Sequence, residues 1–164
     1  MFERFDGDVR RAVLAAAEEV TGRRGDPRLG TEHLLYGLAA VGDGVTVDLG
    51  ITPERVHREL IAWDLEALGS VGLETDPDVV ASVPIRHHRW WGPIKHHVPF
   101  TDGAKNALKR SLQICTSEGH RSIGTGHLLA GLAVGGPRDP AVRLLYRLGL
   151  DPAVVDQRAR ASWS

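Results

Sequence analysis

The 164-residue chain carries one apolar pattern twice, and this internal repeat constrains the fold more than any other feature. Phe5 and Phe100 each open a stretch in which apolar or small residues recur in steps of three and four, as on one face of an amphipathic helix. The matched positions, 95 residues apart, are Val9, Ala12, Val13, Ala16, Ala17 and Val20 in one copy and Ala104, Ala107, Leu108, Ser111, Leu112 and Cys115 in the other. We therefore expect two copies of one helical unit.

Two further blocks match in the same order, residues 30–38 with 124–132 and residues 49–56 with 148–155. Helix-start signals divide each copy into about four helices, with the third shorter by about one turn in the first copy. These signals are the expected N-caps Thr31 and Thr125 and the pairs Thr52-Pro53, Asp139-Pro140 and Asp151-Pro152. Gly50 and Gly149 suit left-handed helix ends. Because no stretch alternates with period two, an all-α fold is predicted.

Charge and composition exclude several functional classes. The formal net charge is −1, which excludes a whole-protein electrostatic footprint for nucleic acid. No uninterrupted apolar stretch approaches the roughly 20 residues of a membrane span, and the start of the chain lacks the pattern of a secretory signal. A single cysteine excludes an internal disulfide. We expect a soluble, cytoplasmic protein that binds neither nucleic acid nor a membrane.

The repeat predicts a division into residues 1–63 and 99–164, joined by residues 64–98. Within this connection, residues 64–68 and 76–83 are expected to form short helices, and residues 86–97 form a loop rich in histidine and tryptophan. The adjacent histidines of this loop point in different directions unless it folds back, so we expect no metal site there. Trp90 and Trp91 suit either a recognition loop or a cover over the seam between the copies, and we favour the cover.

The block Gly30-Thr31-Glu32-His33-Leu34-Leu35 and its second copy at residues 124–129 resemble the signature of the N-terminal domain of Clp ATPases, the Clp repeat domain. The opening Met1-Phe2-Glu3-Arg4-Phe5 is similar to that of the actinobacterial ClpC group, and Phe100-Thr101 with Ala104-Lys105 resembles the start of that family's second copy. The resemblance implies one compact all-α domain of two four-helix repeats related by pseudo-twofold symmetry.

In that family the domain precedes ATPase modules and receives adaptors and substrates for an unfoldase–protease machine. The present chain has no Gly-x-x-x-x-Gly-Lys-Ser/Thr loop, so it lacks a phosphate cradle and an ATPase of its own. The resemblance therefore implies a stand-alone docking domain.

The motif around Thr31 and Glu32 is one candidate binding site. A carboxylate at this place favours the positive end of a helix dipole, which is a purely structural role. The family resemblance implies a second role, since some members bind phosphorylated arginine through the glutamate of this motif in each copy. A carboxylate and a guanidinium would form a forked hydrogen bond. The second copy has Gly126 in this position, so one of the two expected carboxylates is missing.

Three further residues carry possible chemistry but are expected to be structural. His33 and His127 recur at matching positions, and two ligands are too few for a closed zinc site. We expect them to be hydrogen-bonded packing residues. Cys115 occupies the position of Val20 on the buried helix face and is expected to be an inert core residue.

A second candidate site follows from the resemblance to the actinobacterial group. The residues that match a surface binding cyclic peptide antibiotics in those relatives are Phe2, Arg10, Val13, Phe100 and Lys105. We expect pseudo-twofold symmetry to bring Phe2 and Phe100 together, where an aromatic pair ringed by cations would grip an apolar peptide. The alternative is that both phenylalanines cap the core.

The sequence thus predicts a non-enzymatic binding protein with no catalytic residues, no metal and no cofactor. It would hold Clp ATPase or protease components, adaptors, substrates or peptides, and so modulate Clp-dependent proteolysis. The alternative is self-protection, in which the protein sequesters a cyclic peptide antibiotic before it reaches the unfoldase.

Overall fold

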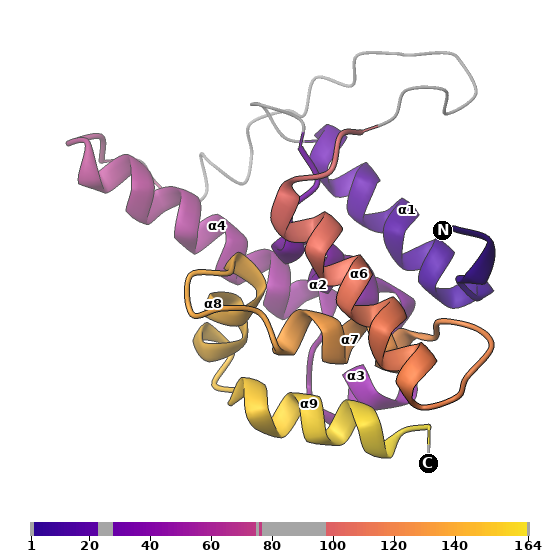
Figure 1. The fold of residues 1–164 in the computed structure, drawn as a ribbon. Coiled ribbons are helices and arrows are strands. Elements are labelled where there is room, and N and C mark those ends of the chain that lie inside the picture. The colour runs from indigo at the N-terminus through magenta and orange to yellow at the C-terminus, as the bar shows by residue number, and fades with distance from the viewer. Residues whose placement is uncertain (1, 23–27, 75, 77–97, 164) are drawn as a thin grey trace.

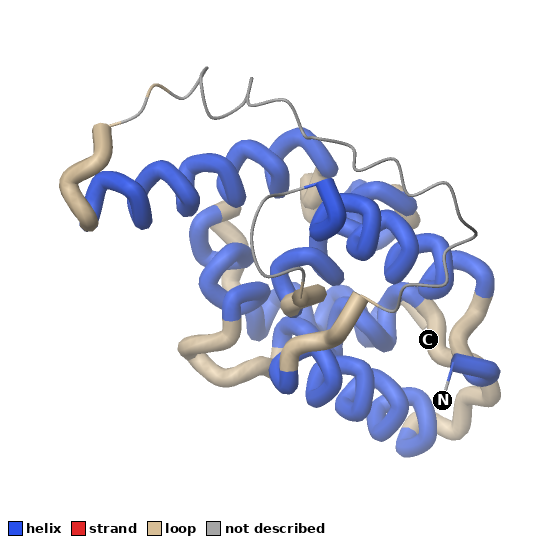
Figure 2. Tube along the Cα trace, turned by 90° about the horizontal axis from the view of Figure 1, so that it is seen from above, coloured by secondary structure: helices blue, strands red, loops and turns tan. Residues whose placement is uncertain are grey.

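A computed structural model describes residues 2–22, 28–74, 76 and 98–163 of the chain. Apart from two isolated β-bridges, these residues form helices and the turns between them (Figures 1 and 2). The helices are η1 (Phe2–Arg4), α1 (Gly7–Gly22), α2 (Thr31–Val41), α3 (Gly44–Asp48), α4 (Pro53–Ser70), α6 (Asp102–Ser117), α7 (Thr125–Ala133), α8 (Pro140–Arg147) and α9 (Pro152–Ala161).

The helices α1 to α4 correspond in order to α6 to α9, which confirms the predicted all-α fold of two four-helix repeats. The third helix is the shorter one in the first repeat, since α3 has 5 residues and α8 has 8. Gly50 and Gly149 have positive φ angles of 67° and 78° after these helices, as predicted for left-handed helix ends.

The helix α4 continues beyond the boundary expected between residues 63 and 64. Residues 64–68 therefore belong to α4 and form no separate short helix. Arg147 of α8 supports this extension, because its guanidinium donates hydrogen bonds to Glu66 at 2.8 and 3.0 Å and to Glu59 at 3.0 Å. Arg143 adds a cation–π contact 4.7 Å from the ring centroid of Trp63. The expected helix at 76–83 and the loop at 86–97 lie, except for Asp76, outside the described residues.

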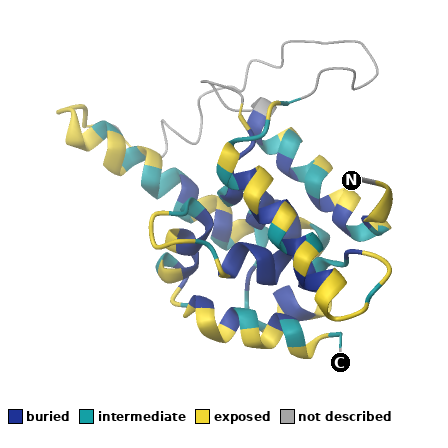
Figure 3. Cartoon of the chain, in the orientation of Figure 1, coloured by how far each residue is buried: buried dark blue, intermediate teal, exposed yellow. Residues whose placement is uncertain are grey.

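The second helix of each repeat lies at the centre of the domain (Figure 3). The helix α2 packs against α1, α4, α7 and α8, and α7 packs against α6 and α9. The central leucines are fully buried; they are Leu34, Leu35 and Leu38 in α2 and Leu128, Leu129 and Leu132 in α7. One continuous core therefore spans both repeats.

A glycine in each central helix lets the first helix of its repeat approach closely. A Cβ atom at Gly37 would lie 1.9 Å from the backbone oxygen of Ala12 in α1. A Cβ atom at the equivalent Gly131 would lie 2.4 Å from Oγ of Ser111 and 2.9 Å from the oxygen of Ala107 in α6. Only glycine allows the two pairs of helices to cross at this distance.

Backbone hydrogen bonds join the segments that precede the helices of opposite repeats. Leu29 donates to the oxygen of Pro99 at 2.9 Å and accepts from Thr101 at 2.9 Å. In the symmetric place, Ile123 donates to the oxygen of Arg4 at 2.7 Å and accepts from Asp6 at 3.1 Å.

This symmetry makes Phe100 the counterpart of Phe5. Phe100 forms a β-bridge with Leu29 of the first repeat, and Phe5 forms the matching bridge with Ile123 of the second. The expected proximity of Phe2 and Phe100 stays a prediction, since the side chain of Phe2 lies outside the described part of the structure.

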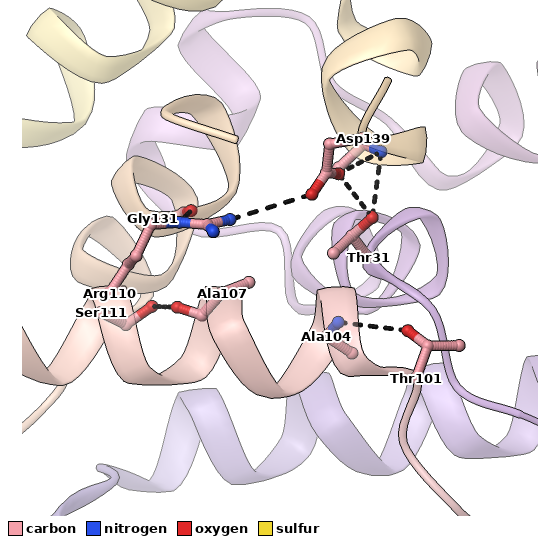
Figure 4. A network of polar contacts seen from close by, with 9 residues as sticks. Thr31, Thr101, Ala104, Ala107, Arg110, Ser111, Gly131 and Asp139 are labelled. Atoms are coloured by element: carbon pink, nitrogen blue, oxygen red, sulfur yellow. Dashed lines mark hydrogen bonds and ion pairs between the residues drawn. The ribbon is translucent and has the colours of Figure 1, made fainter. Parts of the chain in front are cut away.

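The structure also corrects the expected N-caps of the central helices. Gly30 and Gly124 are the N-cap residues, and Thr31 and Thr125 are the first helical residues. The hydroxyl of Thr31 donates instead to the carboxylate of Asp139 at 2.6 Å, and that of Thr125 donates to Asp43. Each aspartate is the N-cap of the third helix of the opposite repeat, so these hydroxyls bind the two repeats together. Figure 4 shows the contact between Thr31 and Asp139.

Substitution of Gly37 tests the close crossing of α1 and α2. We expect Gly37→Ala to lower the free energy of unfolding by about 3 kcal/mol or more, because the added methyl group meets backbone rather than a movable side chain. The control is Gly69→Ala in α4, where the added Cβ meets nothing within 4 Å. We expect the control to raise stability by about 0.5 kcal/mol through helix propensity. Urea unfolding measures both, and equal stabilities would contradict the close crossing.

Candidate functional site

The N-termini of α2 and α7 are built alike and form the two equivalent positions of the candidate site. In the first repeat, the backbone N–H of Gly30 donates to Nδ1 of His33 at 3.0 Å. In the second, the N–H of Gly124 donates to Nδ1 of His127, also at 3.0 Å. Each histidine thus closes the first turn of its own helix, where a glutamate or glutamine is more common. The prediction that both are hydrogen-bonded structural residues is confirmed.

The carboxylate of Glu32 folds back over the N-terminus of α2. Its Oε1 lies 3.5 Å from Nδ1 of His33, and a Cβ at Gly30 would lie 2.3 Å from its Oε2. Oε2 is buried and has no hydrogen-bond donor within the described parts of the chain. Since Nδ1 of His33 already accepts a hydrogen bond, it offers no proton to Oε1 either. Within the described residues, Oε2 is thus stabilised by packing and by the helix dipole rather than by a hydrogen bond.

Thr31, the other residue expected at this site, is 1% exposed. Its hydroxyl donates to Asp139 and accepts from the backbone N–H of Ala141 at 3.2 Å. Arg110 completes the surroundings, with Nη2 3.8 Å from Oδ2 of Asp139 and Nε donating to the oxygen of Gly131 at 2.8 Å (Figure 4). The Thr31 hydroxyl thus uses both its donor and its acceptor function inside the protein. Of the two expected site residues, only Glu32 remains available to a ligand.

In the second repeat an indole occupies the place of the missing carboxylate. A Cβ at Gly126 would lie 2.6 Å from Oγ of Ser162 and 2.8 Å from Cε3 of Trp163. The indole of Trp163 stacks on the imidazole of His127, with centroids 4.3 Å apart and an interplanar angle of 16°. Sequence reasoning missed Trp163. The glycine at position 126 was a sign that something packs there, but nothing in the spacing indicated what.

A second histidine, His120, contacts both His127 and Trp163 and affects the protonation of His127. Nδ1 of His120 lies 2.8 Å from Nε2 of His127. Because Nδ1 of His127 accepts from Gly124, its Nε2 carries the proton and donates to His120. Burial lowers the pKa of His127, the charge of His120 lowers it further, and Asp6 and Glu118 act in the opposite direction. The arrangement favours the neutral form of His127.

The residues of the expected peptide surface are distributed over the first helix of each repeat. Arg10 on α1 and Lys105 on α6 are exposed, and Lys105 lies 3.4 Å from the carboxylate of Asp102. Val13 and Phe100 are partly buried and pack against the core. Phe2 lies in η1, ahead of α1, and its side chain is outside the description.

Cys115 is fully buried, as predicted for a core residue. Its Sγ contacts the backbone oxygens of Ser122 at 3.3 Å and of His120 at 3.4 Å. Burial raises the pKa of the thiol, so the nucleophilic thiolate is disfavoured.

The described residues offer neither a metal cluster nor a membrane-spanning helix. They contain no group of three or more histidine, cysteine, aspartate or glutamate side chains placed to hold a metal ion. Among their helices, none is both long enough and apolar enough to cross a membrane.

Comparison with known proteins places this double repeat among chaperone domains. No family model matches the chain. It is 33% identical over 155 residues to a chloroplastic ClpA homologue, an ATP-binding subunit of the ATP-dependent Clp protease of Brassica napus, covering 94% of this chain and 15% of the relative. Chloroplastic ClpC1 of Arabidopsis thaliana is 33% identical over 155 residues, covering 94% and 14%. The chain thus spans about 15% of the length of these relatives.

A solved structure shares the fold over the whole chain. It is the N-terminal domain of the caseinolytic protease associated chaperone ClpD from Arabidopsis thaliana, with a TM-score of 0.69, 23% sequence identity and coverage of 100% of both chains. The double repeat therefore has the fold of the N-terminal domain of this chaperone. The chain has the fold of a Clp N-terminal domain and is related in sequence to the ClpA and ClpC chaperones. The narrower kinship with the actinobacterial group stays a prediction.

The lowered pKa of His127 predicts a loss of stability in acid. The unfolded chain takes up a proton near pH 6.5 that the folded protein resists, so the contribution of this group is complete above that pH and is lost as the pH falls. We expect His127→Gln to lose less stability than the wild type between pH 7.5 and pH 5.5, because glutamine can accept from Gly124 without titrating. Urea unfolding at both pH values measures this.

The control is His33→Gln, the same change in the first repeat, where the neighbouring side chain is the carboxylate of Glu32. Comparison of the two variants separates the effect of the surroundings of His127 from the effect of the substitution itself. An acid sensitivity unchanged in His127→Gln would show that this histidine does not titrate between the folded and unfolded states.

Proposed function

We propose that this domain is a docking module of the Clp unfoldase–protease system that binds substrates or adaptors through Glu32 and catalyses no reaction itself. The relatives are ATP-binding subunits and chaperones of that system, which supports the assignment of the partners to Clp components, their adaptors and their substrates. The observation that carries the proposal is the Glu32 carboxylate, whose Oε2 lacks a hydrogen-bond donor in the described structure.

The energetics of Glu32 favour an incoming cation. Its side chain is 22% exposed, so the carboxylate lies at the surface although Oε2 is covered. Rotation toward a ligand breaks no hydrogen bond to Oε2, while a guanidinium would supply two charge-assisted ones. The chemical class that fits is therefore an arginine side chain, and phosphorylated arginine is the form that the family resemblance implies.

Removal of the charge at Glu32 tests this proposal. The probe is a peptide with one phosphoarginine, titrated calorimetrically into the domain. We expect one strong site per chain, and we expect Glu32→Gln to weaken binding by about 1.5–3 kcal/mol, or roughly 10- to 100-fold.

The matched control is Glu54→Gln, because Glu54 is the second residue of α4, as Glu32 is of α2, and is exposed. It should bind the probe like the wild type. Equal affinity in Glu32→Gln, or equal affinity of the wild type for a peptide without arginine, would contradict the proposal.

A second candidate function is the sequestration of a cyclic peptide antibiotic. It is favoured by the partly exposed apolar side chains of Val13 and Phe100 and by the exposed cations Arg10 and Lys105 on the first helices of the two repeats. Together with Phe2, these residues would form the apolar surface and cationic rim that such a ligand requires.

Truncation of the phenylalanines tests the second candidate. We expect Phe2→Ala and Phe100→Ala each to weaken binding of an apolar cyclic peptide antibiotic by about 2 kcal/mol through lost aromatic contact. Tyr146→Ala is the control, since Tyr146 is an aromatic residue on α8 that is 60% exposed. Unchanged affinity in both phenylalanine variants, with native circular dichroism, would assign Phe2 and Phe100 to the core instead.

A further inference from the structure

We infer that Trp163, in the segment after α9, occupies the position in the second repeat that corresponds to the ligand site at Glu32. The domain therefore has one site available to ligand, at Glu32, and a second site blocked by its own chain. The inference rests on the proposed function for the meaning of the site, but its structural part is tested separately below. It starts from the equivalence of the two helix N-termini, which share the glycine cap, the threonine at the first helical position and the histidine that accepts from the cap.

The equivalence makes position 126 the counterpart of Glu32. Gly126 is buried, and any side chain there would meet Ser162 and Trp163 at 2.6 and 2.8 Å. A glutamate at 126 and the indole of Trp163 in its present place therefore exclude each other. The first site has a carboxylate and the second has an indole in its stead.

Specific contacts hold the indole in this position. Its face stacks on His127, and it forms a T-shaped contact with the ring of His120, with centroids 6.2 Å apart and an interplanar angle of 88°. The preceding Ser162 is fixed to the end of α9, since its N–H and its hydroxyl both donate to the oxygen of Ala159, at 3.2 and 2.6 Å. Because α9 packs on α7, residues 162 and 163 are positioned at the N-terminus of α7 by the end of α9.

The chemical consequence concerns the ligand. An indole stacked on a neutral imidazole offers no carboxylate to a guanidinium, so the second position does not take an arginine side chain. The domain is therefore monovalent for the ligand of Glu32, although its fold has two equivalent positions.

The test is a pair of substitutions measured singly and together. Gly126→Glu should lower the urea midpoint of the wild type, or prevent folding, because the glutamate and Trp163 compete for one space. In the Trp163→Ala background, the same change should lower the midpoint clearly less, because only the contact with the Ser162 hydroxyl remains. Gly136→Glu is the control, because a Cβ at Gly136 meets nothing within 4 Å and its effect should be the same in both backgrounds.

Calorimetry with the phosphoarginine peptide gives the second readout. The wild type should bind one peptide per chain, and Gly126→Glu/Trp163→Ala should bind two. A midpoint that falls equally in both backgrounds would overturn the inference. If the coupling of the midpoints is present but no variant binds the peptide, then Trp163 occupies the position as inferred and the proposed ligand of Glu32 is wrong.

Discussion

The two hydroxyl–carboxylate bonds between the repeats are the interaction on which the rest of the structure depends. Asp139 caps α8 by accepting from the N–H of Ala141 at 3.0 Å, and Asp43 caps α3 by accepting from Thr46 at 3.0 Å. Each carboxylate also accepts the hydroxyl of a threonine from the opposite repeat. Because buried polar groups must find partners, neither repeat satisfies its own groups alone. This exchange joins the N-terminus of each central helix, where the candidate sites lie, to the third helix of the opposite repeat.

Departures from the symmetry mark the places where the repeats have acquired different roles. Glu32 has no counterpart at Gly126, and Trp163 fills the space that results. Arg110 approaches Asp139 in one half, whereas the residue 95 positions earlier is Ala15. A symmetric scaffold supplies two equivalent positions, and single substitutions decide what each one does.

Much of the fold could be predicted from the sequence because its signals are local. The steps of three and four after Phe5 and Phe100 identify α1 and α6, and the proline after Thr52, Asp139 or Asp151 fixes a helix start in each case. The histidines at positions 33 and 127 could be assigned to packing for the same reason, since their partner is three residues away.

The features that the sequence could not predict depend on distant partners. Thr31 resembles an N-cap, but its hydroxyl is drawn to Asp139, 108 residues further on. The helix α4 extends beyond its expected end because Arg147, on another helix, binds Glu66. Trp163 reaches Gly126 only through the packing of α9 on α7. Periodicity and cap chemistry contain no information on such pairs.

The backbone bonds that join opposite repeats also bear on the order in which the chain folds during synthesis. Arg4 and Asp6 form backbone hydrogen bonds with Ile123, which is synthesised more than a hundred residues later. The first residues of the chain therefore cannot form these bonds until Ile123 has been made. Contacts of such sequence separation slow folding, because the entropy of closing the loop is lost before the contact forms. The segments before α1 and α2 therefore emerge without their backbone hydrogen-bond partners, and the nascent chain exposes the apolar faces of α1 and α2 until the second repeat is complete.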